Sequence, residues 1–215
     1  MPMLKWFVGC LGVSILVVHF ADVEQRSAEL QRFLIDKNDG ASQIILRYGM
    51  TNEQCPQIRA GDVYRLALAF VTVETFATPT VESRTRGLVV EGANLVGVPI
   101  PDISIGPGRI RLDTARAALI RSVSPDLGPY RNLNDAELAE KLLERCDAAK
   151  VAALILEDVI RDTGRASDAL DLRLIRIAAK RYNGQSDRPR SLDGAISAAI
   201  YFDLIYEIFQ HYRFG

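Results

Sequence analysis

The chain has 215 residues, of which 48% are hydrophobic and 25% charged, and its formal net charge is −1. This is an ordinary globular composition, and the length suffices for one domain with a sizeable core. The balanced charge gives no reason to expect nucleic acid as a partner. Only two histidines, His19 and His211, are present, so a His-based zinc site or a Ser-His-Asp triad is poorly supplied. We expect neither a metal nor a cofactor.

The N-terminus carries an uncharged, largely apolar run from Trp6 to Ala21. It is long for the apolar part of a secretory signal and short for a membrane helix of roughly 20 residues. Lys5 precedes the run and Asp22 follows it, which favours a cytoplasmic N-terminus. We therefore expect residues 1–22 to be a signal anchor or a signal peptide, with the anchor favoured because the cleavage pattern is poor. A buried core helix is the alternative.

This prediction makes the rest of the chain, residues 23–215, an exported domain held at the membrane and facing the periplasm or another extracytoplasmic space. Cys55 and Cys146 would then lie in an oxidising compartment, where they could form a disulfide. Two unpaired thiols packed as small hydrophobic groups are the alternative. The third cysteine, Cys10, lies within the apolar run.

Hydrophobic periodicity predicts helices along most of the exported part. In the first half, the pattern indicates an amphipathic helix from Val23 to Lys37 that Asn38-Asp39-Gly40 ends, and then a short apolar piece, Ser42 to Tyr48. An apolar helix from Asp62 to Phe76 follows and ends before Thr78-Pro79. The next predicted helix lies between Thr80 and Gly97.

The second half begins with a glycine-rich stretch, Asp102 to Gly108, that suits a short strand or an extended turn. Further helices follow, and together the elements predict an all-α single domain behind the N-terminal segment. The expected helices and their starts are Thr114 to Arg121 capped by Asp113, a helix opened by an Asn134/Glu137 capping box, Ala148 to Asp162 opened by Asp147, Asp168 to Tyr182, and Gly194 to Tyr212.

Glu74 lies in line with the apolar face of the Asp62 to Phe76 helix, where Val63, Leu66, Ala67 and Phe70 precede it. A carboxylate in such a stripe must be paired, exposed at a rim, or held protonated, because burying the ionised form is costly. A protonated carboxyl is what a general acid needs. The alternative is a helix-end glutamate that faces water or pairs with an arginine.

Three features follow one another along the chain. Glu74 closes the apolar helix, a Gly106-Pro107-Gly108-Arg109 turn leads towards a helix starting near Asp113-Thr114-Ala115, and Tyr182-Asn183-Gly184 closes a later helix. This order resembles the lysozyme-like superfamily, in particular the lytic transglycosylases and goose-type lysozymes. There a helix-terminal Glu is followed by a Gly-x-x-Gln turn running into a Ser/Thr-Ala helix, and later by Ala-Tyr-Asn-Gly. Arg109 departs from the usual glutamine, and Thr75 departs from the usual serine after the Glu.

The resemblance implies a peptidoglycan-cleaving glycosidase that acts on the bond between N-acetylmuramic acid and N-acetylglucosamine. Glu74 would protonate the glycosidic oxygen and then accept a proton, either from the sugar's C6 hydroxyl or from water. The resemblance implies peptidoglycan strands as the partner. The residues that it implies for substrate binding are Ser104, Ile105, Gly106, Gly108, Arg109, Tyr182 and Asn183.

Other readings of the same residues stay open. Ser104 is also a residue that caps turns, Tyr182 suits a core position, and Asn183-Gly184 is an ordinary helix stop. The main alternative function is a non-catalytic, membrane-anchored scaffold that has a lysozyme-like fold and binds glycan or an envelope protein. A helical interaction domain without any link to glycan is a third.

Overall fold

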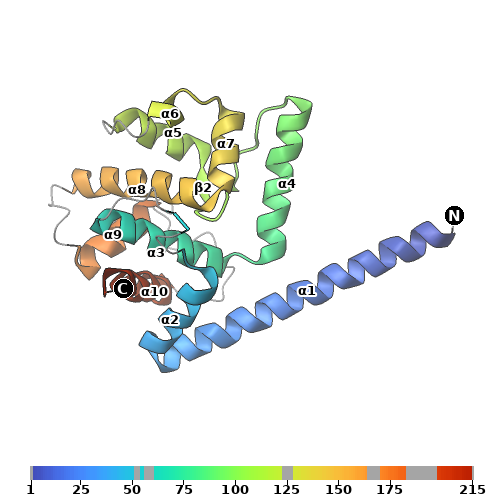
Figure 1. The fold of residues 1–215 in the computed structure, drawn as a ribbon, viewed down its shortest axis with the longest axis horizontal. Helices are drawn as coiled ribbons and strands as arrows, with labels where there is room; N and C mark the ends of the chain where they lie inside the picture. The colour runs from blue at the N-terminus through green and yellow to red at the C-terminus, as the bar shows by residue number, and fades with distance from the viewer. Residues whose placement is uncertain are drawn as a thin grey trace.

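The computed structural model describes residues 2–50, 54–55, 61–122, 128–163, 170–182 and 198–214, and the side chains of residues 2–18, 198 and 213–214 are not described. Nearly all of the described chain is helical, so the all-α prediction is confirmed. Figure 1 shows a body of packed helices from which one long helix projects. The elements are α1 (Pro2–Ile35), α2 (Lys37–Tyr48), α3 (Asp62–Ala77), α4 (Thr80–Val96), β1 (Ser104–Ile105), β2 (Ile110–Arg111), α5 (Leu112–Arg121), α6 (Gly128–Arg131), α7 (Asp135–Leu143), α8 (Arg145–Asp162), α9 (Leu172–Tyr182) and α10 (Ala198–Phe214).

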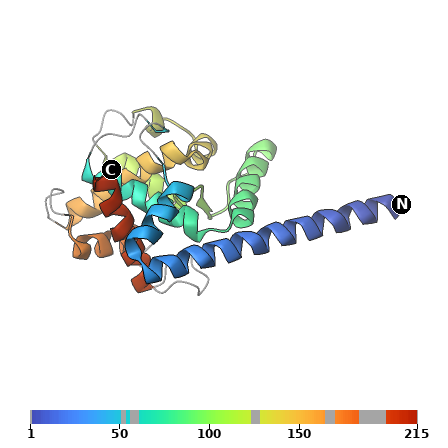
Figure 2. The same ribbon diagram turned by 60° about the horizontal axis from the view of Figure 1, so that its bottom comes forward.

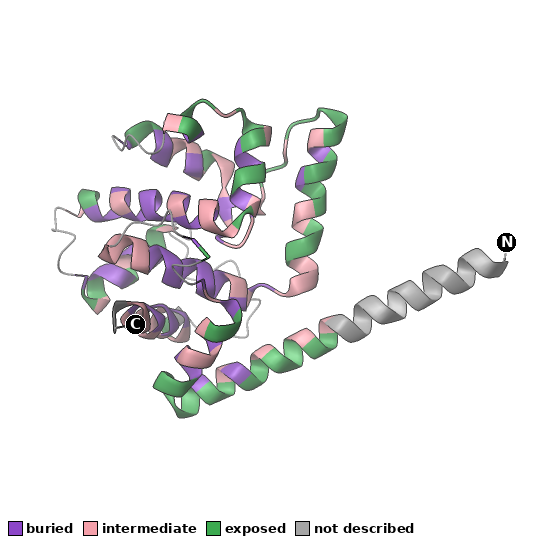
Figure 3. Ribbon diagram, viewed as in Figure 1, coloured by how far each residue is buried: buried purple, intermediate pink, exposed green. Residues whose placement is uncertain are grey.

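Helix α3 forms the centre of the body. It packs against α8 on one side and α10 on another, and it also contacts α2. Ten of its 16 residues are buried, including Leu66, Ala67 and Phe70 of the predicted apolar face. Figure 3 shows this concentration of buried residues along α3 and α8. The prediction that the Asp62 to Phe76 stretch is a core helix is confirmed.

Several predicted helix ends are also confirmed. Thr78 ends α3, and Gly97 ends α4 in the left-handed conformation with φ 69°, which glycine adopts without steric cost. The capping box is complete, since the Asn134 side chain accepts from the Glu137 N–H and the Glu137 carboxylate accepts from the Asn134 N–H. The glycine-rich stretch, Asp102 to Gly108, contains the short strand β1, which pairs antiparallel with β2 just after the stretch, with Ile105 opposite Ile110.

Three local predictions are wrong. Asn38-Asp39-Gly40 does not break a helix but lies in the first turns of α2, because the Asp36 side chain accepts from the Asn38 and Asp39 N–H groups and caps that helix. Asp113 lies inside α5, which begins at Leu112. Asp147 lies inside α8, where its carboxylate accepts from the Tyr130 hydroxyl at 2.5 Å.

Glycine at position 40 has a packing reason. A Cβ there would lie 2.3 Å from the Cα of Phe33, so only glycine allows α2 to fold back this closely on α1. Phe33 is 1% exposed and belongs to the core. The turn between α1 and α2 therefore depends on a small residue that the sequence pattern makes look like a helix breaker.

Helix α1 joins the predicted apolar run and the predicted Val23 to Lys37 helix into one continuous helix. Figures 1 and 2 both show its N-terminal part projecting from the body. Most of the Trp6 to Ala21 run lies outside the described side chains. Within the part of the chain that is described, no helix has the length and apolar character needed to cross a membrane.

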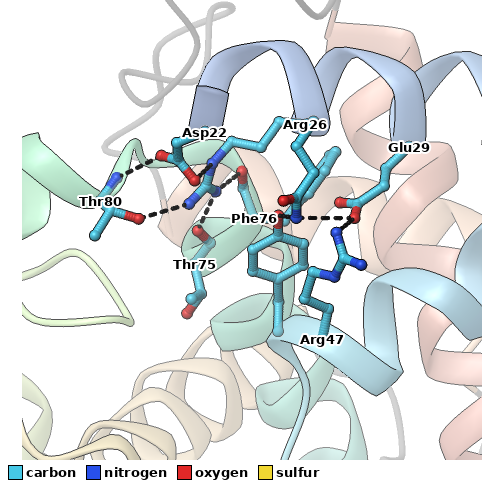
Figure 4. A network of polar contacts seen from close by, with 9 residues as sticks. Asp22, Arg26, Glu29, Arg47, Thr75, Phe76 and Thr80 are labelled. Atoms are coloured by element: carbon cyan, nitrogen blue, oxygen red, sulfur yellow. Dashed lines mark hydrogen bonds and ion pairs between the residues drawn. The ribbon is translucent and has the colours of Figure 1, made fainter. Parts of the chain in front are cut away.

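The C-terminal half of α1 holds the corner between α3 and α4 (Figure 4). The Arg26 guanidinium donates to the backbone carbonyls of Thr75, at 2.8 Å, and of Phe76, in the last turn of α3. Asp22 accepts from the N–H of Thr80, the first residue of α4, at 2.8 Å, and also binds Arg26. Helix α1 thus caps the end of α3 and the start of α4, and it satisfies backbone groups that would otherwise lack hydrogen-bond partners at these helix ends.

Cys55 and Cys146 form a disulfide, as the sequence allowed, with their Cα atoms 5.5 Å apart. The bond joins the segment before α3 to the first turn of α8 across 91 residues. It encloses α3, α4, the hairpin and α5 to α7 in one covalent loop.

Replacing Cys55 by Ala is expected to lower the free energy of unfolding by about 2–4 kcal/mol, because the unfolded chain regains the freedom that the closed loop removes. Chemical denaturation followed by circular dichroism measures this loss. Cys10→Ser is the control and should leave the midpoint unchanged. Equal midpoints for Cys55→Ala and the wild type would contradict the bond's contribution.

Candidate active site around Glu74

Glu74 lies one turn before the end of α3 and is 1% exposed. Its position follows from helical spacing, since Leu66, Ala67 and Phe70 on the same face are fully buried. The backbone carbonyl of Glu74 accepts from the Thr78 N–H and ends the helix. The sequence prediction that Glu74 continues a buried stripe is confirmed, and a side chain facing bulk water is excluded.

The Glu74 carboxyl receives a hydrogen bond from Tyr201 on α10. The Tyr201 hydroxyl donates to Oε1 at 2.5 Å, and Tyr201 itself is fully buried. A buried carboxyl group without such a donor would cost several kcal/mol, roughly, in its ionised form. The bond therefore connects α10 to α3 at the buried acidic residue of the core helix.

Tyr182, the last residue of α9, lies beside the same group. Its ring is 4.9 Å from the ring of Phe70, centroid to centroid, which is an ordinary aromatic packing distance. Burial raises the pKa of Tyr182 well above its usual range, and the neighbouring Glu74 carboxyl group raises it further. Tyr182 therefore stays a neutral hydrogen-bond donor.

The Tyr182 hydroxyl donates to the backbone carbonyl of Gly108 at 2.6 Å. This bond connects the end of α9 to the turn of the β1–β2 hairpin. The structure thus brings together the helix-terminal acid, the glycine-rich turn and the tyrosine that the sequence places far apart. It does so through Tyr182, whose ring contacts α3 and whose hydroxyl contacts the turn.

The turn itself is held against α7. Gly106 has φ 66°, and a Cβ on it would lie 1.7 Å from the Leu142 carbonyl oxygen, so no larger residue fits. The Arg109 N–H donates to the Gly106 carbonyl at 3.0 Å and closes the turn. Arg109 also has a positive φ, 49°, which non-glycine residues seldom adopt.

The side chain of Arg109 extends towards the start of α4. Its guanidinium donates to the Thr78 hydroxyl at 3.2 Å and to the Glu82 carboxylate at 3.1 Å, and the side chain is 8% exposed. It therefore links the hairpin to the α3–α4 corner. The Ser104 carbonyl makes a second link to α4, by accepting from Arg86 at 3.2 Å.

The remaining residues predicted to bind substrate are Ile105, Gly108 and Asn183. Ile105 is fully buried, so its side chain is part of the core. Gly108 is buried beneath Tyr182. Asn183 lies outside the described residues.

Tyr201 is the site residue that sequence reasoning missed. The Gly194 to Tyr212 stretch is predicted as a helix, and Tyr201 gives no separate signal within it. A tyrosine among apolar core positions does require a buried partner for its hydroxyl. Glu74 is a buried acid that requires a hydrogen-bond donor, so the sequence could have suggested pairing the Tyr201 hydroxyl with the Glu74 carboxyl group.

We compared the chain with protein-family models, curated proteins and solved structures, and none of them matches it.

Tyr201→Phe is expected to lower the free energy of unfolding by about 1–3 kcal/mol, because it removes the hydroxyl that the buried Glu74 carboxyl accepts from. Denaturant titration at neutral pH measures the change. Tyr206→Phe, on the same helix but only half-buried, is the matched control and should change stability little. A Tyr201→Phe protein as stable as the wild type would show that this bond contributes nothing net.

Gly106→Ala is expected to be strongly destabilising, because the added Cβ meets the Leu142 carbonyl and the positive φ disfavours alanine. Gly92→Ala is the control, since open space surrounds that position within α4. There alanine should raise stability by about 0.5–1 kcal/mol. Melting temperatures of the two variants should therefore shift in opposite directions.

Proposed function

We propose that the protein is a peptidoglycan-cleaving glycosidase of the lytic transglycosylase or lysozyme type, held at the membrane by its N-terminal segment. The observation that carries the proposal is the buried carboxyl of Glu74, which meets Tyr201 and lies beside Tyr182 and the turn that Tyr182 binds. An apolar site favours the protonated form of a carboxyl group, and a glycosidase acid must be protonated when substrate binds.

Each residue has a role in this proposal. Tyr201 donates to Oε1 and so fixes the orientation of the carboxyl group that carries the proton. That proton passes to the glycosidic oxygen as the bond to the anomeric carbon breaks. The carboxylate then takes a proton from the attacking hydroxyl, either the C6 hydroxyl of the same sugar or a water molecule. Tyr182 positions the Gly108 backbone at the edge of this site.

A non-catalytic scaffold with the same helical body is the second candidate. It is favoured by the 1% exposure of Glu74 and by Arg109, whose guanidinium is engaged by Thr78 and Glu82 within the protein. In this alternative the acid and its tyrosines hold helices together, and glycan or an envelope protein binds elsewhere. The two candidates differ in whether sugar products are released.

To test the proposal, purified peptidoglycan is incubated with the full chain, and the released muropeptides are identified by mass spectrometry. The wild type should release products, and Glu74→Gln should lower the rate by about 10²- to 10⁴-fold, because glutamine keeps the shape and cannot donate the proton. The wild-type rate should also fall as the pH rises and the acid ionises. Anhydro ends would assign the attack to the C6 hydroxyl, and reducing ends would assign it to water.

Glu29→Gln is the matched control. Glu29 is also a buried glutamate, at 6% exposure, but it pairs with Arg47 on the α1–α2 side of the body. This variant should keep the wild-type rate. No release by either protein would overturn the enzyme and leave the scaffold. Equal release by Glu74→Gln and the wild type would overturn Glu74 as the catalytic acid.

A further inference from the structure

Helix α4 has an apolar outer surface that the rest of the body leaves exposed. Its other side, with Val90 and Ala93 buried, packs against α7. On the outer surface, large apolar side chains face solvent, and their exposed fractions are 67% for Leu88, 88% for Leu95 and 68% for Val96. Val98, just beyond the helix, is 52% exposed. Large apolar side chains exposed so close together along the chain are typical of a contact site, although the charged Glu91 is exposed between Leu88 and Leu95.

The position of α4 relative to α1 identifies what this surface meets. The first residue of α4, Thr80, donates its N–H to Asp22 of α1. Asp22 directly follows the uncharged Trp6 to Ala21 run, and Phe20 near the end of that run is 63% exposed. Figures 1 and 2 show α4 crossing the direction of α1 instead of running along it. The outer surface of α4 therefore lies at the level where the apolar run ends.

The length of the run adds a physical reason. Its 16 residues (6 to 21) form about 24 Å of helix at about 1.5 Å per residue, against a hydrocarbon core of roughly 30 Å. A bilayer that thins around a short apolar helix moves its headgroup layer towards the adjoining protein. Because α4 starts at the end of the run and crosses it, this displacement brings its outer surface against the lipid.

We propose that the outer surface of α4, made of Leu88, Leu95, Val96 and Val98, rests in the interfacial layer of the bilayer that holds the N-terminal run. The proposal depends on the membrane anchoring in the proposed function, and not on the glycosidase chemistry. Arg84 is exposed one turn before Leu88 on the same side of α4, where a cation suits lipid phosphate groups. Helix α4 is then a second point of contact that fixes how the body is oriented on the membrane.

The test uses the full chain with Cys10→Ser, reconstituted in phosphatidylcholine–phosphatidylglycerol vesicles. An environment-sensitive fluorophore is attached at Leu95→Cys, and in a second protein at Ile120→Cys. Ile120, on α5, is 81% exposed and thus a matched exposed apolar position, and α7 separates it from α4 in Figure 1. The Leu95 label should shift to shorter wavelength and lose emission with brominated lipids, whereas the Ile120 label should do neither.

Each other outcome overturns the proposal in a distinguishable way. Equal emission and equal quenching at the two positions would show that no bilayer covers α4. Failure of the protein to float with the vesicles would overturn the anchoring and this inference together, while muropeptide release by Glu74 is measured independently. A shift at Leu95 that depends on protein concentration and ignores brominated lipid would assign the surface to a second copy of the chain.

Discussion

A carboxyl group inside the central helix is the constraint on which the rest of the body depends. Glu74 has lost almost all contact with water, and the low polarity around it makes an unpartnered charge there very costly. Tyr201 offsets that cost with a hydroxyl from α10. Tyr182 then carries the contact outward, from the ring of Phe70 to the backbone of Gly108. Helix α10 is therefore positioned by the polar requirement of Glu74 as well as by apolar packing, and the Tyr182 hydroxyl links α9 to the hairpin.

The corner that follows Glu74 is stabilised from outside α3 and α4. Thr78 is the C-cap of α3 and Pro79 is the N-cap of α4, but a proline has no side chain that could cap the helix. Asp22 and Arg26 on α1 fill that role, and Arg109 reaches the same corner from the hairpin. An α1 that shifts along its axis would break contacts to the backbone immediately after Glu74. The N-terminal helix is thus part of the site's support, although it projects from the body.

The sequence allowed most of the helices to be predicted, because period-3.6 stripes such as Leu66 to Phe70 and local caps such as Asn134 with Glu137 act within a few residues. Prediction from the sequence failed where a contact between residues far apart in the chain determines the local structure. Gly40 looks like a breaker but serves a close approach of α2 to α1. In the site, Glu74 followed from its stripe, whereas its donor Tyr201 did not, because their pairing spans 127 residues. No local pattern carries information over that separation.

The disulfide has a consequence for the order of events during synthesis. The bond needs Cys146, which emerges only after α3, α4, the hairpin and α7 have all been made. Those elements must therefore pack together without help from the disulfide, which forms only after they are already arranged. The tyrosines that meet Glu74 and the hairpin turn come later still, on α9 and α10. The Glu74 carboxyl group accordingly lacks the Tyr201 hydroxyl until residue 201 of 215 has been made, and a chain that stalls before that residue exposes the surface that α10 covers.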